Sequence, residues 1–301
     1  MKTFKLLPIF LTLCNAVAIK RQTTCEDPAV RKEWRSLTDS EKSNYLEAVQ
    51  CLQATPSRLS NSNSTSLFDD FPNVHRQLDL EIHLVGVFLP WHRWFIQLYE
   101  DALRDECNYT GYATYWDWSL DYQDPFSSAV FDAKLGFGGD GDSSTGCVTD
   151  GPFKDLQVST PNDHCLQRSF TASVFEEYAA PGLVNETLDI GLYSLFRPAL
   201  ENGLHRSAHG GLGGDMLQNY SPNDPIFYLH HGNIDRIWWE WQSVNSSRQT
   251  EYGGNRYQDD AATEATLQDE VPMIEDFIDE SQAVENIMWV QSGRFCYTYD
   301  S

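Results

Sequence analysis

The sequence predicts a mainly α-helical fold, an antiparallel four-helix bundle with long loops and few short strands. Seven of the eight histidines fall within residues 75–92 and 205–231, and each stretch covers parts of two predicted helices. The stretch 224–241, DPIFYLHHGNIDRIWWEW, repeats apolar residues at helical spacing, at Ile226, Phe227, Leu229, Ile234, Ile237, Trp238 and Trp241. Two adjacent histidines lie inside this apolar pattern, and a buried imidazole needs a partner for its nitrogens.

The N-terminal half predicts helices separated by one exposed loop. Residues 28–52 predict two helical pieces, and Thr38 with Glu41 can cap the second. Residues 68–87 predict a helix that ends before Pro90, because proline disfavours helical backbone in the residue before it. A new helix is expected to follow over 91–106.

The C-terminal half predicts further helices over 169–178 and 187–201 and the helix that starts at Asp224-Pro225, where Asp can cap and proline suits the first position. Loops are predicted over 121–163 and 251–270, which are polar and rich in turn-forming residues. The final stretch, 275–299, has only weak strand and turn character.

The acidic composition restricts the partners. The net charge is -23 at pH 7 and the pI is about 4.5, so the chain would repel nucleic acids and anionic membrane surfaces. We therefore expect neither nucleic acid nor a membrane as a partner. The hydrophobic fraction of 41% is enough for a sizeable core. The sequence carries no signal of oligomeric state.

The N-terminus predicts secretion. A positively charged start precedes an apolar stretch too short to span a bilayer, and residues 16–18, AVA, fit a small-residue cleavage site. We therefore expect a signal peptide over 1–18, a possible propeptide to residue 21, where a dibasic pair ends, and a single domain over 22–301. Five glycosylation sequons agree with secretion, at Asn63, Asn108, Asn185, Asn219 and Asn245.

Cysteine usage also predicts an extracellular protein. Six cysteines follow the predicted signal peptide, and an even number in a secreted chain predicts three disulfides. We favour a bond between Cys147 and Cys165, which flank a loop. We also expect Cys25 and Cys296, near the two ends of the chain, to pair.

The histidine spacing predicts two three-nitrogen sites, one formed by His75, His83 and His92 and the other by His205, His209 and His231. His205 and His209 are four residues apart and would share one face of a helix. His75 and His83 are about two turns apart and can also share a face. Each site would be completed by a histidine from a neighbouring helix, which places two metals among four antiparallel helices.

Several metals accept imidazole, including zinc, copper, iron and nickel. Carboxylate-bridged di-iron sites need helical Glu-x-x-His pairs, which the sequence lacks. No glutamate lies between His205 and His209, so the zinc-protease motif is also absent. Two adjacent all-imidazole sites favour a coupled copper pair that binds dioxygen. Structural zinc, usually bound with cysteine ligands, is the alternative.

Two segments carry a specific resemblance. The first is His83-Leu-Val-Gly-Val-Phe-Leu-Pro-Trp-His92-Arg93, and the second is Asp224-Pro225-x-Phe227-x3-His231-x3-Asp235. They resemble the two copper-binding signatures of the tyrosinase and catechol oxidase (polyphenol oxidase) family. The segment 115–118, YWDW, and the closing Tyr-x-Tyr at 297–299 are similar to further motifs of that family.

The resemblance implies a type-3 dicopper centre that uses dioxygen as co-substrate and oxidises small phenols. It implies that the two three-histidine sites bind one copper ion each and that His230 is a buried neighbour. His164 lies in the loop between Cys147 and Cys165, so we expect it to be an ordinary surface histidine. Phe227 is expected to form an aromatic wall beside the coppers. Asp235 is expected either to orient a ligand or anchor its helix, or to form a surface pair with Arg236 or Arg93.

Two positions bear on the substrate. Family members that hydroxylate monophenols use a glutamate, which Glu201 resembles, and an asparagine after the first ligand of the second site. Arg206 stands at that position here, and a guanidinium has no lone pair to orient a water molecule. We therefore expect oxidation of o-diphenols (catechols) to o-quinones, with weak or absent monophenol hydroxylation. Arg206 could instead attract anionic phenols.

Other features separate this chain from some relatives. No cysteine lies between His75 and His92, so we expect no thioether crosslink to a ligand, and no C-terminal shielding domain fits after the Tyr-x-Tyr motif. The alternatives within the family are a true tyrosinase or an o-aminophenol oxidase. The alternatives of another class are a haemocyanin-like oxygen carrier and a helical zinc protein.

Overall fold

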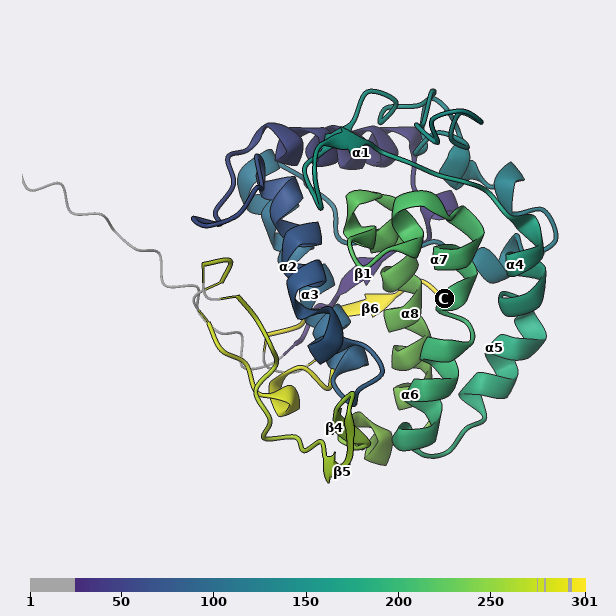
Figure 1. The fold of residues 1–301 in the computed structure, drawn as a ribbon. Helices are drawn as coiled ribbons and strands as arrows, with labels where there is room; N and C mark the ends of the chain where they lie inside the picture. The colour runs from purple at the N-terminus through teal and green to yellow at the C-terminus, as the bar shows by residue number, and fades with distance from the viewer. Residues whose placement is uncertain (1–24, 275, 279, 292–293) are drawn as a thin grey trace, which may run out of the picture.

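Helix α8 (Ile226–Ser243) lies at the centre of the molecule, with α2 and α3 on one side and α6 and α7 on the other (Figure 1). The computed structural model describes residues 25–301 except 275, 279 and 292–293. The predicted signal peptide and propeptide lie outside the described residues. The other helices are α1 (Asp39–Ala54), α2 (Leu67–Ile82), α3 (Phe88–Cys107), α4 (Ala172–Tyr178), α5 (Pro181–Leu188), α6 (Tyr193–Asn202) and α7 (Arg206–Leu212). The mainly α prediction, with few short strands, is confirmed.

The best-defined helices follow the local sequence signals. Thr38 Oγ1 accepts the backbone N–H of Glu41, and the Glu41 carboxylate accepts the backbone N–H of Thr38 at 2.8 Å, which is the capping box predicted for α1. Helix α8 begins at Ile226, directly after Pro225, and is buried on nearly all sides. A helix that is apolar all round is expected at the centre of a fold.

Two local predictions are wrong, and tertiary structure explains both. Residues 29–31 form a strand, β1 (Ala29–Arg31), rather than part of a helix, because they pair in parallel with β6 (Tyr297–Tyr299) from the other end of the chain. Pro90 does not separate two helices. It lies in the first turn of α3, where a backbone N–H has no intrahelical partner to lose.

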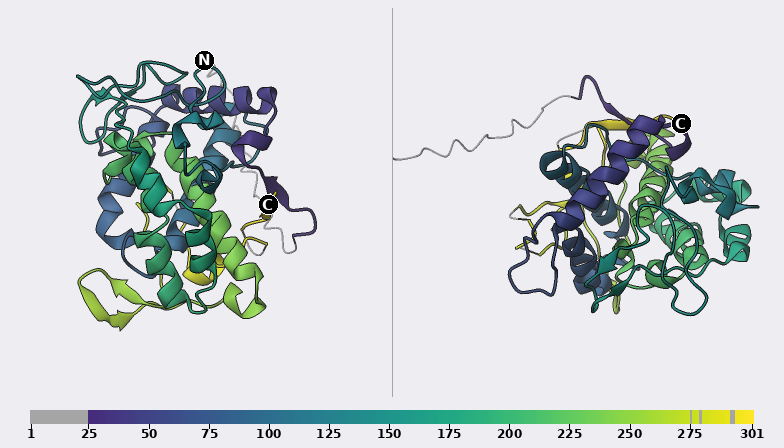
Figure 2. Two further views of the ribbon diagram at one scale, coloured as in Figure 1. Left: turned by 90° about the vertical axis from the view of Figure 1, so that its right-hand side faces the viewer. Right: turned by 90° about the horizontal axis from the view of Figure 1, so that it is seen from above.

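The helix boundary near the first histidine group lies earlier than predicted. Helix α2 ends at Ile82, and the chain turns at Leu84, which has a left-handed φ of 58°. The segment 187–201, predicted as one helix, contains the end of α5 and most of α6. The predicted loop 251–270 contains a hairpin, β4 (Asn255–Tyr257) and β5 (Asp260–Glu264). This hairpin lies at the end of the molecule opposite α1 (Figures 1 and 2).

Three disulfides join distant parts of the chain. Cys25 bonds to Cys296 beside the β1–β6 pair, and Cys147 bonds to Cys165 beside the short strands β2 (Gln157–Val158) and β3 (His164–Cys165). Both predicted pairings are therefore confirmed. The third bond joins Cys51 of α1 to Cys107 at the end of α3.

Candidate metal centre

Seven histidines form two adjacent groups among the central helices. The side-chain nitrogens within each group lie within 4.8 Å of one another, in one group from His75, His83 and His92, and in the other from His205, His209, His230 and His231. The groups touch, because the rings of His92 and His231 stack with centroids 4.3 Å apart. The structure therefore brings together all six histidines that the sequence predicted as ligands.

The backbone carries these side chains differently from the prediction in two places. His75 lies in α2, but His83 follows the end of that helix in extended backbone, so the two do not share a helix face. His92 lies in the second turn of α3 rather than at its start. His205 immediately precedes α7, which carries His209.

Five of the rings are oriented by backbone carbonyls that accept the Nδ1–H. The pairs are His75 with Asn219 at 2.7 Å, His83 with Asp79 at 3.1 Å, His92 with Phe88 at 2.8 Å, His205 with Glu201 at 3.2 Å and His209 with Met216 at 2.6 Å. A carbonyl oxygen can only accept, so the proton of each neutral ring is on Nδ1. The Nε2 atom of each ring therefore has a free lone pair.

These lone pairs are available for a metal. The Nε2 atoms of His75, His92 and His205 are buried and have no hydrogen-bond partner in the protein. Burial, reinforced by neighbouring histidines, lowers the pKa of each of these three imidazoles well below its ordinary value, and burial lowers the pKa of His209 to about 4. The rings are therefore neutral at pH 7, which metal ligation requires. Unpaired buried imidazole nitrogens fit copper well.

His231 is held in another way. Its Nδ1 atom has no hydrogen-bond partner, and its Nε2 atom lies 3.3 Å from Nε2 of His209. The ring is fixed by stacking on His92 and by packing against Phe227, whose centroid is 4.2 Å away. Phe227 is fully buried and also lies within 5.3 Å of the His75 ring, so it forms an apolar wall between the two groups.

His230 has the opposite tautomer. Trp118 Nε1–H points to its Nδ1 atom at 3.2 Å, and an indole N–H can only donate. The neutral ring of His230 therefore carries its proton on Nε2, which is buried and has no hydrogen-bond partner. A protonated nitrogen offers no lone pair, which supports a role beside the site rather than in it.

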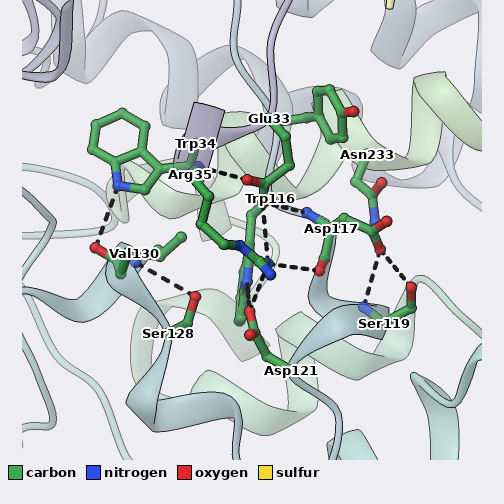
Figure 3. Close-up of polar contacts among 12 residues, drawn as sticks. Glu33, Trp34, Arg35, Trp116, Asp117, Ser119, Asp121, Ser128, Val130 and Asn233 are labelled. Carbon is green, nitrogen blue, oxygen red and sulfur yellow. Dashed lines mark hydrogen bonds and ion pairs between the residues drawn. The ribbon is translucent and has the colours of Figure 1, made fainter. Parts of the chain in front are cut away.

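The segment that carries Trp118 is fixed by charged groups. Figure 3 shows Arg35 between Asp117 and Asp121, with its Nη2 atom 3.1 Å from the Asp117 carbonyl and 2.8 Å from the Asp121 carboxylate. Glu33 accepts the backbone N–H of Asp117 at 3.2 Å. The same segment is joined to α8 by the ion pair of Asp117 with Arg236 at 3.2 Å and by the backbone N–H of Trp116, which donates to the Leu229 carbonyl at 3.2 Å. These contacts place the Trp118 indole opposite His230.

Asp235 anchors α8 one turn after His231. It is 3% exposed, its Oδ1 lies 2.5 Å from Nε of Arg93, and its Oδ2 accepts from Arg31, Tyr297 and Tyr299. This arrangement supports an anchoring role and rules out a surface pair. Because Arg93 follows His92, the same ion pair aligns α3 with α8 beside the two histidine groups.

Glu201 precedes His205 by four residues, and Arg206 directly follows it. Both oxygens of Glu201 are engaged, one with Arg197 at 2.6 Å and the other with the backbone N–H of Leu84 at 2.6 Å. Arg206 is exposed, and its guanidinium lies over the ring of Tyr178 at 5.1 Å from the centroid. His164, predicted as an ordinary surface residue, is instead paired with buried Asp215 at 2.8 Å.

Several groups that shape the site were not predicted from the sequence. The carbonyls of Asn219 and Met216 are backbone atoms and carry no side-chain signal. Trp118 lies in a segment whose partner could not be inferred from spacing. The contact of Arg197 with Glu201 could have been predicted, because Arg197 precedes Glu201 by four residues and this spacing favours an ion pair on a helix.

The part of the chain that the structure describes contains no helix with the length and apolar character of a membrane span.

The family model for the common central domain of tyrosinase matches residues 65–244, which contain both histidine groups. The tyrosinase ustQ of Aspergillus flavus is 39% identical over 293 residues, which cover 91% of this chain and 80% of that protein. The N-acetyl-6-hydroxytryptophan oxidase ivoB of Emericella nidulans is 32% identical over 355 residues, covering 95% of this chain and 96% of that protein.

A solved structure is also similar to this chain. A polyphenol oxidase variant from Thermothelomyces thermophila has 30% sequence identity and a TM-score of 0.84, covering 91% of this chain and 89% of that chain.

Proposed function

Because the chain belongs to the tyrosinase family and is an oxidase of that family, we propose that it oxidises o-diphenols to o-quinones with dioxygen and hydroxylates monophenols weakly or not at all. The proposal of weak or absent monophenol hydroxylation rests on the contacts of Glu201. Each of its oxygens already accepts a hydrogen bond at 2.6 Å. The glutamate that could accept a phenolic proton is thus committed to other partners.

The metal in this proposal is a pair of copper ions. The grouping of the rings, with the unpartnered Nε2 atoms of His75, His92 and His205, supports His75, His83 and His92 as ligands of one ion and His205, His209 and His231 as ligands of the other. When bound, the copper ions would carry dioxygen and accept the two electrons of the diphenol. Burial lowers the pKa of His75, His92, His205, His209 and His231, so the protein keeps these five imidazoles neutral. The buried ring of Phe227 adds an apolar surface beside both groups.

The limited role in proton transfer rests on the contacts of Glu201 and not on its pKa. Burial raises the pKa of Glu201 above its ordinary value, although Arg197 opposes this effect. The raised pKa by itself would favour proton uptake. The carboxylate is instead held in place by Arg197, which is 5% exposed, and by the Leu84 amide, so neither oxygen is free of a partner.

Arg206 supports the same proposal. Its side chain is exposed and stacks on Tyr178, so it orients no water molecule for proton transfer beside His205. Its positive charge near α7 could still attract anionic phenols, as the sequence suggested.

Oxygen uptake by the copper-loaded protein tests the proposal. We expect rapid, lag-free uptake with 4-methylcatechol and at least tenfold slower uptake with tyramine or tyrosol, the tenfold step corresponding to about 1.4 kcal/mol in the barrier. Monophenol turnover as fast as catechol turnover would indicate a true tyrosinase. A preference for o-aminophenol over catechol would indicate an o-aminophenol oxidase. Binding of oxygen without turnover of any of these substrates would indicate an oxygen carrier.

We also propose that the protein is secreted and glycosylated. The three disulfides suit an oxidising compartment. All five sequon asparagines are exposed. N-terminal sequencing of the secreted protein should show residue 19 or residue 22 first, and enzymatic deglycosylation should lower its mass. An unprocessed, unglycosylated product from a eukaryotic host would contradict this part.

A further inference from the structure

Glu201 contacts both histidine groups through different atoms. Its backbone carbonyl accepts the Nδ1–H of His205 at 3.2 Å, which orients a ring of the second group. Its side-chain Oε1 accepts the backbone N–H of Leu84 at 2.6 Å, directly after His83 of the first group. The rings of His83 and His205 have centroids 6.5 Å apart, so one residue reaches both sides of the gap between the groups.

The turn after His83 needs an external support. Helix α2 has ended at Ile82, and Leu84 adopts a left-handed φ of 58°, which is unfavourable for a residue with a side chain. Leu84 is 47% exposed, so its own side chain supplies little packing. Its N–H is instead held by the Glu201 carboxylate.

Neighbouring elements complete the support. Asn255 of β4 donates to the Leu84 carbonyl at 2.8 Å, and Gln258 donates to the His83 carbonyl at 2.9 Å. Arg197 contacts the Glu201 carboxylate at 2.6 Å and the Asn255 side chain at 3.3 Å. The arginine therefore joins the carboxylate and the hairpin on the same turn, and balances the buried charge.

We propose that Glu201 is a positioning residue that ties the two histidine groups together. Its carbonyl orients His205, its carboxylate fixes the turn that presents His83, and Arg197 neutralises the carboxylate so that it can remain buried. The spacing between the two groups depends on this connection. The part concerning copper rests on the copper site proposed above, whereas the connection itself does not.

A matched pair of neutral double variants tests the role. Glu201→Gln/Arg197→Met removes both charges but keeps a side-chain oxygen that can accept from Leu84. Glu201→Leu/Arg197→Met removes the charges and the acceptor, with a side chain of similar size. Thermal unfolding of both metal-free proteins establishes that they fold, and residue-resolved hydrogen exchange reports on the Leu84 amide.

We expect the Leu84 amide to be protected in the wild type and in the Gln/Met variant, and to exchange at least tenfold faster in the Leu/Met variant. In copper titrations, the Leu/Met variant should bind one of its two ions about 10- to 100-fold more weakly, which is typical of losing an outer contact that orients a ligand. The Gln/Met variant should bind both ions with nearly wild-type affinity.

Unchanged Leu84 exchange and unchanged copper affinity in the Leu/Met variant would overturn the proposal, even if its melting temperature fell. Equal loss of copper in both variants would also overturn it, because the charge and not the connection would then matter. If the Leu/Met variant does not fold, rapid exchange of Leu84 in the wild type overturns the proposal, and protection supports it. A protected Leu84 amide in a wild-type protein that binds no copper would support the connection and refute the proposed function.

Discussion

Replacing Asp235 by alanine should destabilise the protein strongly, because this carboxylate is the common partner of four side chains from three other parts of the chain. It lies between Arg93 of α3 and Arg31 of β1, and it accepts hydrogen bonds from Tyr297 and Tyr299 of β6. Arg93 and Arg31 are 0% and 1% exposed. Removing the anion leaves both guanidinium groups buried beside a void.

The expected loss follows from the burial of the pair. Removing one partner of a buried ion pair costs about 3–5 kcal/mol. Arg93 keeps contacts to two backbone carbonyls and to Gln242, and Arg31 keeps Glu100, so a value in this range is more reasonable than a larger one. For a chain of this size that loss corresponds to roughly 5–9 °C in melting temperature.

The assay is thermal unfolding of the metal-free protein at a fixed heating rate. Glu106→Gln is the control, because Glu106 forms an exposed ion pair with Arg58 at 2.8 Å, and such pairs contribute about 1 kcal/mol or less. A fall of less than about 2 °C in Asp235→Ala, equal to the control, would refute the reasoning. It would mean that the two arginines find other partners without cost.

The pH dependence of a second variant, Asp235→Asn, supplies a further check. Burial raises the pKa of Asp235, but Arg93 and Arg31 outweigh that effect and leave the pKa below its ordinary value of 3.8. A depressed carboxyl pKa contributes stability above pH 3.8, and this stability is lost as the pH falls through the lower folded pKa. The difference in melting temperature between the wild type and Asp235→Asn should therefore shrink below pH 3.8.

Three further predictions concern the surroundings of the histidines. Burial lowers the pKa of His164, but the Asn162 carbonyl and Asp215 outweigh this effect and leave the pKa above 6.5. The stability that His164 contributes is therefore fully present below pH 6.5 and is lost as the pH rises through the folded pKa. His164→Gln should lower the melting temperature more at pH 5.5 than at pH 8.5, and an equal loss at both pH values would contradict this prediction. Chelation of copper should lower the melting temperature, and re-addition should restore it. Copper binding should add about 2.7 kcal/mol to the free energy of unfolding when free copper is 100-fold above the dissociation constant. A melting temperature that does not depend on copper would contradict the proposed site. Trp118→Phe removes the donor that keeps the proton of His230 on Nε2, so X-ray absorption should detect an additional imidazole on copper, and unchanged coordination would show that the tautomer is held by other contacts.

Local signals predicted the parts of the fold that depend on local physics. The capping box at Thr38 and Glu41 marks the start of α1, and the apolar pattern of α8 marks the central helix. The parallel pairing of β1 with β6 was missed, because a three-residue strand has no periodicity and its partner lies at the other end of the chain. Pro90 was misread, because a proline in the first turn of a helix has the same local sequence signal as a break.

The same division applies to the site. Histidine spacing, supported by the resemblance of the flanking motifs, predicted which six rings come together, although His83 is presented by extended backbone and not by the helix face that the spacing predicted. The orientation of those rings depends on carbonyls of Asn219 and Met216, which any residue could supply. The engagement of Glu201 by Arg197 and Leu84 depends on a turn whose left-handed residue gives no glycine or asparagine signal in the sequence.

Six of the seven clustered histidines are proposed to bind two copper ions, and His230 is proposed to bind none. Anomalous diffraction from crystals of the copper-loaded protein, recorded on both sides of the copper absorption edge, would locate the ions. We predict two copper peaks, one among the Nε2 atoms of His75, His83 and His92 and one among those of His205, His209 and His231. A single peak, an anomalous signal that appears only above the zinc edge, or a peak bonded to His230 would contradict the proposed site.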